Sequence, residues 1–276
     1  IESIGYSTRG RGYVRLLMKG IHVNEKVSHR GECYMTINVD ENTDFQSLNE
    51  KIHSAAERSI VINGCIGQRY IGSGVTDKKI IIHGTPGNAL GAYLNGGEIY
   101  IYGNAQDATG DTMNSGTIVI HGNVGDATGY AMRGGKIYVK GNTGYRAGIH
   151  MKAYMEYKPV IVIGGRAGSF LGEYQAGGII VVLGQNDDGL PIINNFCGTG
   201  MHGGKIYLRC KSLPHRIPSQ VRTERLCGKK DLELKGIIDD YCKYFENMNA
   251  ECLLNADFFV LTPDSENPYK RMYTDN

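Results

Sequence analysis

The sequence contains no tryptophan, only 7 prolines and no strong excess of either charge. Its 276 residues carry a formal net charge of +2, which gives no general electrostatic case for nucleic-acid binding. No apolar stretch reaches the roughly 18 residues of a membrane span, and no signal peptide is recognised. We therefore expect neither a nucleic acid nor a membrane as partner, and a cytoplasmic location.

Paired cysteine motifs are also missing. The seven cysteines are odd in number and scattered, and none forms a Cys-x-x-Cys pair. This pattern argues against a disulfide framework and against a zinc or iron–sulfur site within this chain. A reducing compartment is the simplest setting for them. The cysteines are Cys33, Cys65, Cys197, Cys210, Cys227, Cys242 and Cys252.

Glycine is abundant, with 39 residues, and it is arranged in a repeat. Short aliphatic runs such as "IIIHG", "IYIYG", "IVIHG" and "IYVKG" recur, and successive runs start 19 to 26 residues apart. Three further sets of positions keep the 19-residue step. They are the glycines Gly72, Gly91, Gly110, Gly129 and Gly148; the row Leu94, Met113, Met132 and Met151; and small pairs such as Gly96-Gly97 and Gly134-Gly135.

A 19-residue unit is too short for a helical repeat and fits one coil of a parallel β-solenoid. Along each strand Ile, Val and Leu alternate with polar or tyrosine residues, so that Ile99, Ile118 and Ile137 would face inward while Tyr100 and Tyr138 face outward. We predict an all-β core, a single-stranded right-handed parallel β-helix of about seven to eight coils with α-helical flanking segments. The expected divisions are 1–58, 59–210 and 211–276, and the Leu and Met row is expected to fill the interior.

The stretch "VIVIGGRAGSFLG" at 160–172 resembles the phosphate loop of a dinucleotide-binding fold. However, Gly164, Gly168 and Gly172 continue the repeat of Gly141, Gly144 and Gly148. No helix fits between Gly168 and the next aliphatic run, so no helix N-terminus is available for a pyrophosphate. We predict that these glycines serve the turns.

The flanks carry helical patterns. Residues 44–57 have Phe45, Leu48, Ile52 and Ala55 on one face, and Thr43 with Gln46 fits a capping box. This helix is expected to plug the first coil, with residues 1–40 forming short strands near it. The apolar positions of 231–248 also follow helical spacing, and that helix is expected to cap the other end or to dock a partner.

The two terminal segments are basic in part. Within the first 31 residues Arg9, Arg11, Arg15, Lys19, Lys26 and Arg30 favour a solvated or partner-facing segment over a nucleic-acid arm. After an apolar strand near 258–261, Tyr269, Lys270 and Arg271 belong to a polar tail, which either rests on another surface or is solvated.

Two sets of residues could carry chemistry. His83 and His121 occupy the same position two coils apart, roughly 10 Å from each other, which favours surface residues over metal ligands. Asp107 and Asp126 stand in register on adjacent coils, where they form either an acid pair for carbohydrate cleavage or ordinary turn residues.

The coil consensus, clearest in "GNVGDATGYAMRGGKIYVKGN" at 122–142, resembles the GXGXG family. That family forms the C-terminal β-helical domain of the glutamate synthase large subunit and, more distantly, the β-helical subunit of formylmethanofuran dehydrogenase. The stretches "GRAGSFLGEYQAGGIIVVLGQ", "GTGMHGGKIYL" and "GIIDDYCKYFENMNAECLLN" favour the glutamate synthase branch.

This resemblance implies a stand-alone form of the domain, because the chain has no N-terminal nucleophilic cysteine, FMN barrel or cysteine cluster. A non-catalytic scaffold is then expected, with no catalytic, cofactor or metal residues of its own. FMN and iron–sulfur clusters would lie on partner chains, namely an FMN-dependent glutamate synthase chain and a glutamine amidotransferase chain. Self-association is left open. The alternatives are a scaffold of the formylmethanofuran dehydrogenase type and a carbohydrate-active enzyme on the Asp107/Asp126 face.

Overall fold

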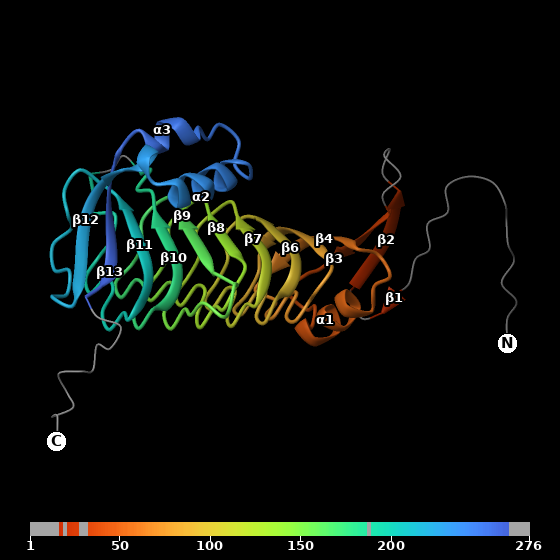
Figure 1. Cartoon of the computed structure of the whole chain (residues 1–276). Helices are drawn as coiled ribbons and strands as arrows, with labels where there is room; N and C mark the ends of the chain where they lie inside the picture. The colour runs from red at the N-terminus through yellow and green to blue at the C-terminus, as the bar shows by residue number, and fades with distance from the viewer. Residues whose placement is uncertain (1–16, 19–20, 28–32, 187–188, 265–276) are drawn as a thin grey trace, which may run out of the picture.

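The computed structural model describes residues 17–18, 21–27, 33–186 and 189–264, which form an elongated solenoid with the C-terminal helices along one side and the first helix near the N-terminal end (Figure 1). The basic N-terminal positions apart from Lys26, and the tail positions Tyr269, Lys270 and Arg271, lie outside the described residues. The helices are α1 (Phe45–Ser54), α2 (Leu232–Cys242) and α3 (Ala250–Leu254), with a 3-10 turn η1 (Gly228–Lys230). The strands are β1 (Leu17–Met18), β2 (Ile21–Val27), β3 (Cys33–Asn38), β4 (Ser59–Ile66), β5 (Lys79–Thr85), β6 (Asn95–Tyr102), β7 (Ser115–Ile120), β8 (Lys136–Val139), β9 (Val160–Ile163), β10 (Ala176–Val182), β11 (Gly203–Arg209), β12 (Val221–Cys227) and β13 (Asp257–Pro263).

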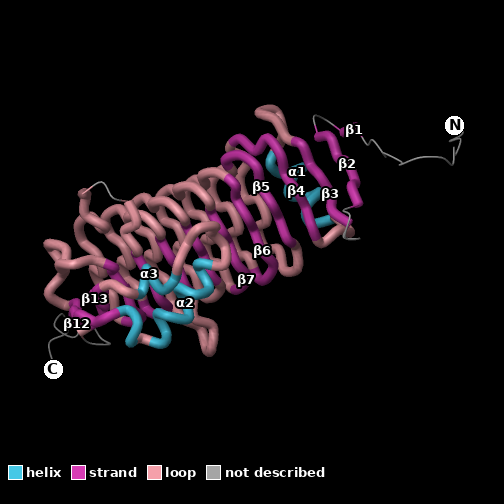
Figure 2. The backbone as a smooth tube through the Cα atoms, turned by 90° about the horizontal axis from the view of Figure 1, so that it is seen from above, coloured by secondary structure: helices cyan, strands magenta, loops and turns pink. Residues whose placement is uncertain are grey.

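The strands follow one another in a single sheet, in the order β1 to β11, then β13 and β12. Figure 2 shows β3 to β7 as successive strands along the solenoid. From β3 to β11 every neighbouring pair is parallel, as the repeat predicts. The prediction of a parallel β-solenoid is therefore confirmed. It has about six turns, slightly fewer than the seven to eight expected.

Identical repeat positions lie side by side inside the solenoid. Ile99 pairs with Ile118 and Ile118 with Ile137, and all three side chains are fully buried. The predicted interior row is confirmed, since Leu94, Met113, Met132 and Met151 are also fully buried. In-register stacking therefore places each aliphatic residue on its equivalent in the next coil, which builds one continuous apolar core.

The 19-residue step lengthens after β8. Ile118 and Ile137 are 19 residues apart, whereas Ile137 and its partner Ile161 are 24 apart. Since Val139 pairs with Ile163, Gly165 rather than the predicted Gly164 stands opposite Gly141. The extra residues form a loop at 152–158.

A second core lies on the outer face of the sheet, under α2 and α3, which run along β7 to β10 in Figure 1. Outward-pointing Val119, Tyr138 and Val162 are at most 1 % exposed, and Ile238 and Tyr241 of α2 are fully buried against them. Tyr138 is thus outward-facing, as predicted, but not solvated. The strands "VIVI" and "IIVV" are apolar on both faces because both faces are covered.

Helix α1 closes the N-terminal end, and Leu48 and Ile52 are fully buried there as predicted. The predicted cap is wrong by one residue, because Asp44, rather than Thr43, accepts the hydrogen bond from the Ser47 N–H at 2.9 Å. Thr43 instead bonds to Asp40 in the preceding turn. Asn49 joins the helix to the first coil, since its side chain donates to the Arg69 carbonyl and accepts from the Gly72 N–H.

Of the two roles expected for the C-terminal helix, that of a cap on the other end is wrong. Val221 of β12, Leu261 of β13 and Ile217 pack against the interior there, while the helix lies on the sheet face. The helix is also shorter than predicted, because α2 ends at Cys242 and Asn247 takes a left-handed conformation (φ 63°). Asn249 then begins α3 by accepting a hydrogen bond from the Cys252 N–H.

Candidate functional site

The carboxylates of Asp107 and Asp126 lie one coil apart and are exposed. Asp107 accepts a hydrogen bond from the backbone N–H of Asp126 at 2.8 Å, and Asp126 accepts one from Tyr145 at 2.8 Å. Asn104 and Asn123 make the same contact with the coil that follows each of them. The structure therefore gives this pair a role in joining coils, and one oxygen of each carboxylate is already engaged.

The two histidines in register do not approach one another. His83 stacks on Tyr102 with ring centroids 5.3 Å apart, and Tyr102 stacks on His121 at 4.5 Å, so a tyrosine separates the imidazoles. Phe245 of the segment after α2 meets the His121 ring edge-on. Burial, together with the charge of Lys140, lowers the pKa of His121. Among the described residues no group of three or more His, Cys, Asp or Glu is placed to hold a metal ion.

The cysteines are thiols without disulfide bonds, as the sequence predicts. Cys65 and Cys197 are buried in the solenoid interior, where burial raises the pKa of each thiol to about 12. A thiol with so high a pKa is not ionised near neutral pH and is a poor nucleophile.

The glycines after β9 belong to turns rather than to a phosphate loop. Residues 164–175 contain no helix, and the Gly165 and Gly168 N–H groups donate to carbonyls of the coil before, those of Gly141 and of Thr143 and Gly144. The sequence prediction that no helix fits between Gly168 and the next strand is confirmed, so these glycines are not followed by the helix N-terminus that a phosphate loop uses.

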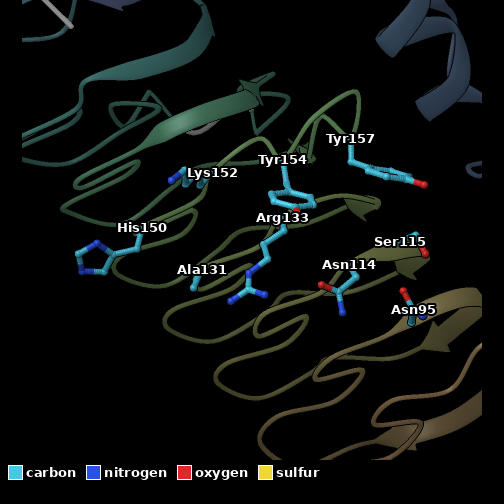
Figure 3. A pocket seen from close by; sticks show the side chains of 9 residues that line it. All are labelled: Asn95, Asn114, Ser115, Ala131, Arg133, His150, Lys152, Tyr154 and Tyr157. Atoms are coloured by element: carbon cyan, nitrogen blue, oxygen red, sulfur yellow. The ribbon is translucent and has the colours of Figure 1, made fainter.

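A large hollow of the described surface lies along one corner of the coils, with a volume of about 680 Å³ (Figure 3). Loop 152–158, which breaks the repeat, contributes Tyr154 and Tyr157, and the coils contribute Arg133 and Asn114 in succession. We call this hollow the basic groove. Its lining residues are Asn95, Asn114, Ser115, Ala131, Arg133, His150, Lys152, Tyr154 and Tyr157.

The lining of the basic groove is one-sided in charge. It includes Arg133, Lys152 and His150 and no acidic residue. Within the described residues no carboxylate lies within ion-pair distance of Arg133 or Lys152, whereas Lys136 and Arg146 elsewhere on the coils are paired with Asp240 and Glu173. The groove is thus a cationic site with exposed tyrosine walls.

Stacked rings border the groove. His150 stacks on Tyr174 with centroids 5.2 Å apart and meets Tyr130 edge-on. In the same turn region, four residues before His150, the Arg146 guanidinium lies 4.8 Å from the centroid of the Phe170 ring, and Phe170 stacks on Phe196. Exposed aromatic and arginine side chains of this kind are enriched at protein–protein interfaces.

The sequence falls within a known motif family, GXGXG, which matches residues 35–262, well over half of the chain. The chain belongs to the GXGXG family. This confirms the resemblance to the glutamate synthase-type GXGXG domain. The GXGXG chain is also 42 % identical over 244 residues to an uncharacterized protein of Methanocaldococcus jannaschii, MJ1350, and the match covers 83 % of this chain and 93 % of that protein.

The turn glycines of the GXGXG chain are needed for two different structural reasons. Gly129 has φ +68°, and a Cβ there would come 2.5 Å from Ile161 Cδ1 in the interior. Gly144 has an ordinary φ, but a Cβ would overlap the Asp126 carboxylate that bonds across the coils. Glycines such as Gly129 are therefore required by a left-handed backbone and a packed interior. Glycines such as Gly144 are required because a side chain would displace the carboxylate that bonds to the next coil.

The sequence interpretation missed the basic groove of the GXGXG chain. A signal was present, because Asn95, Asn114, Arg133 and Lys152 occupy one repeat position in successive coils, and the fourth is followed at once by the long step. An alignment of the coils at that position would have shown two asparagines followed by an arginine and a lysine next to the inserted loop.

Proposed function

We propose that this GXGXG protein is a non-catalytic scaffold subunit of a glutamate synthase-like complex. It would hold an FMN-dependent glutamate synthase chain and a glutamine amidotransferase chain in the cytoplasm, with FMN and iron–sulfur clusters on those partners. Support comes from membership of the GXGXG family, whose motif covers residues 35–262. Among the described residues no helix combines the length and the apolar character needed to cross a bilayer.

One observation carries the proposal. The outer face of β7 to β10 is buried beneath the protein's own helices, whereas elsewhere the coils keep a groove and stacked aromatic rings at the surface. Tyr145 and Phe196 are 51 % and 46 % exposed on the described surface. A rigid rod of stacked coils with such a surface is suited to holding other chains at fixed separation.

The geometry of the other candidate residues is consistent with a scaffold. Asp107 and Asp126 bond to the backbone of the next coil, His83 and His121 are separated by Tyr102, and the thiols of Cys65 and Cys197 are buried. Each of these groups has a structural task in the coil.

Affinity purification of the tagged protein from its native host, with mass spectrometry and flavin absorbance, tests the proposal. We expect an FMN-binding synthase chain and an amidotransferase chain to co-purify. The variant Tyr145→Ala/Phe196→Ala should retain less of them, whereas Leu232→Ala on the helical side should not. Co-purification with molybdenum or tungsten chains would assign the protein to the formylmethanofuran dehydrogenase type instead. A colourless protein without partners would overturn the scaffold role and direct attention to the Asp107/Asp126 face.

A further inference from the structure

We propose that the basic groove receives an extended acidic segment of a partner protein. This inference rests on the proposed scaffold function, because the segment would belong to a chain that the solenoid holds. It adds a defined binding site and a ligand chemistry to the partner-facing corner.

The shape of the groove fits an extended chain. Asn95, Asn114, Arg133 and Lys152 each donate a backbone N–H to the preceding coil in the same way, so they occupy one position in four successive coils. With a spacing of about 4.8 Å between parallel strands, this row is about 15 Å long, which matches about four or five extended residues. A volume of about 680 Å³ leaves room for their side chains.

The charges of the row define what an occupant must carry. Two neutral amides at one end are followed by Arg133 and Lys152, with His150 beside them. The side-chain amides of Asn95 and Asn114 can pair with the N–H and C=O groups of an extended backbone. Arg133 and Lys152 have no carboxylate partner among the described residues, and the guanidinium fork of an arginine matches the geometry of a carboxylate.

The wall formed by loop 152–158 is held in place before any ligand arrives. Tyr154 and Tyr157 exchange backbone hydrogen bonds of 3.0 Å. Tyr157 also packs closely on Gly134, where an added Cβ atom would lie 3.2 Å from Tyr157 Cβ. Lys158 at the end of the loop pairs with Glu233 of α2 at 3.8 Å. A wall that is already ordered reduces the entropy cost of binding, and its two tyrosines supply contact area.

Other occupants fit less of the groove. A small anion would engage the Arg133 and Lys152 end and leave the amide end without a partner. A nucleic acid would meet only this short run of cations on a protein whose net charge is +2. An acidic peptide uses both ends of the row and the tyrosine wall.

Fluorescence anisotropy with fluorescein-labelled hexaglutamate and the full chain tests this directly, with labelled hexaglutamine as the neutral probe. We expect saturable binding of hexaglutamate and at least tenfold weaker binding of hexaglutamine. Arg133→Gln/Lys152→Gln should weaken hexaglutamate binding at least tenfold. Lys229→Gln/Lys230→Gln removes the same charge at η1 and should change it less than twofold. Circular dichroism melts should show both variants folded.

Several outcomes would overturn the inference. Absence of saturable hexaglutamate binding refutes the site. If both double variants weaken hexaglutamate binding equally, the binding reflects general charge attraction. If citrate displaces hexaglutamate tightly, the groove is a small-anion site. If a single-stranded oligonucleotide displaces it tightly, the groove is a nucleic-acid site. If hexaglutamate does not bind while the partner chains still co-purify, the groove assignment is wrong and the scaffold proposal stands. If hexaglutamate binds but no partner chains co-purify, only the scaffold proposal is rejected.

Discussion

The Asp107 carboxylate accepts a hydrogen bond of 2.8 Å from the backbone N–H of Asp126, its equivalent in the next coil. Asp126 repeats the contact with Tyr145, so a side chain joins each coil to its neighbour beside the backbone ladder. Asn104 and Asn123 make the same contact at 2.8 Å, so an uncharged amide oxygen can take the place of the carboxylate oxygen.

Replacing Asp107 separates the structural role from a catalytic one. Asp107→Ala removes the acceptor and should lower the free energy of unfolding by about 1 kcal/mol, whereas Asp107→Asn keeps an acceptor and should cost much less. Urea denaturation of both variants measures the difference. Equal destabilisation by the two substitutions would show that the negative charge matters instead.

The turn glycines should be intolerant of side chains where the interior is packed. Gly129→Val places a Cβ 2.5 Å from Ile161 Cδ1 at φ +68°, and we expect a loss of about 3 kcal/mol or more from overpacking and backbone strain. Gly236→Ala in α2 is the matched control, since no atom lies within 4 Å of its added Cβ. It should stabilise the protein by about 0.5–1 kcal/mol. Thermal and urea unfolding check both, and a Gly129→Val protein with wild-type stability would contradict the packed-coil description.

The outer core predicts a large effect from a residue outside the solenoid. Ile238 of α2 is fully buried against the sheet face, so Ile238→Ala should cost about 2–5 kcal/mol. Leu232 of the same helix is 82 % exposed, and Leu232→Ala should change stability by less than about 0.5 kcal/mol. Hydrogen exchange should show faster exchange of α2 amides in the first variant only. Similar behaviour of the two variants would mean that α2 is not docked on the sheet.

Asp240 should make the docking of α2 sensitive to acid. Burial alone would raise the pKa of Asp240, but hydrogen bonds from Lys136, Tyr138 and Lys243 outweigh it and lower the pKa to about 2. Because the folded-state pKa lies below the unfolded value, the ionised form contributes stability above about pH 4, about 1 kcal/mol after allowance for solvent screening at this partly exposed site. That contribution should be lost as the pH falls from about 4 to about 2.

Urea denaturation across this pH range tests the expectation. Asp240→Asn should flatten the acid slope of stability, whereas Asp239→Asn, which removes an exposed pair with Lys235, should leave it nearly unchanged. An unchanged slope in Asp240→Asn would show that other carboxylates govern the acid response.

The sequence alone determined the repeating part of the molecule. The step between Ile118 and Ile137, the alternation along each strand and the Leu and Met row predict the coils and their interior, because each coil contacts mainly its neighbours. The same local logic excluded a phosphate loop after Ile163, where the next strand follows too soon for a helix. It also placed α1 at the first coil.

The tertiary structure decided what the repeat does not encode. Tyr138 and Tyr241 are 103 positions apart in the chain, and only folding brings them together in the outer core, with ring centroids 5.9 Å apart. The basic groove likewise needs the five-residue longer step, the register after it and the fold of loop 152–158. Periodicity reports contacts between adjacent coils, whereas docking of a distant helix and closure of a groove depend on long-range packing that has no period.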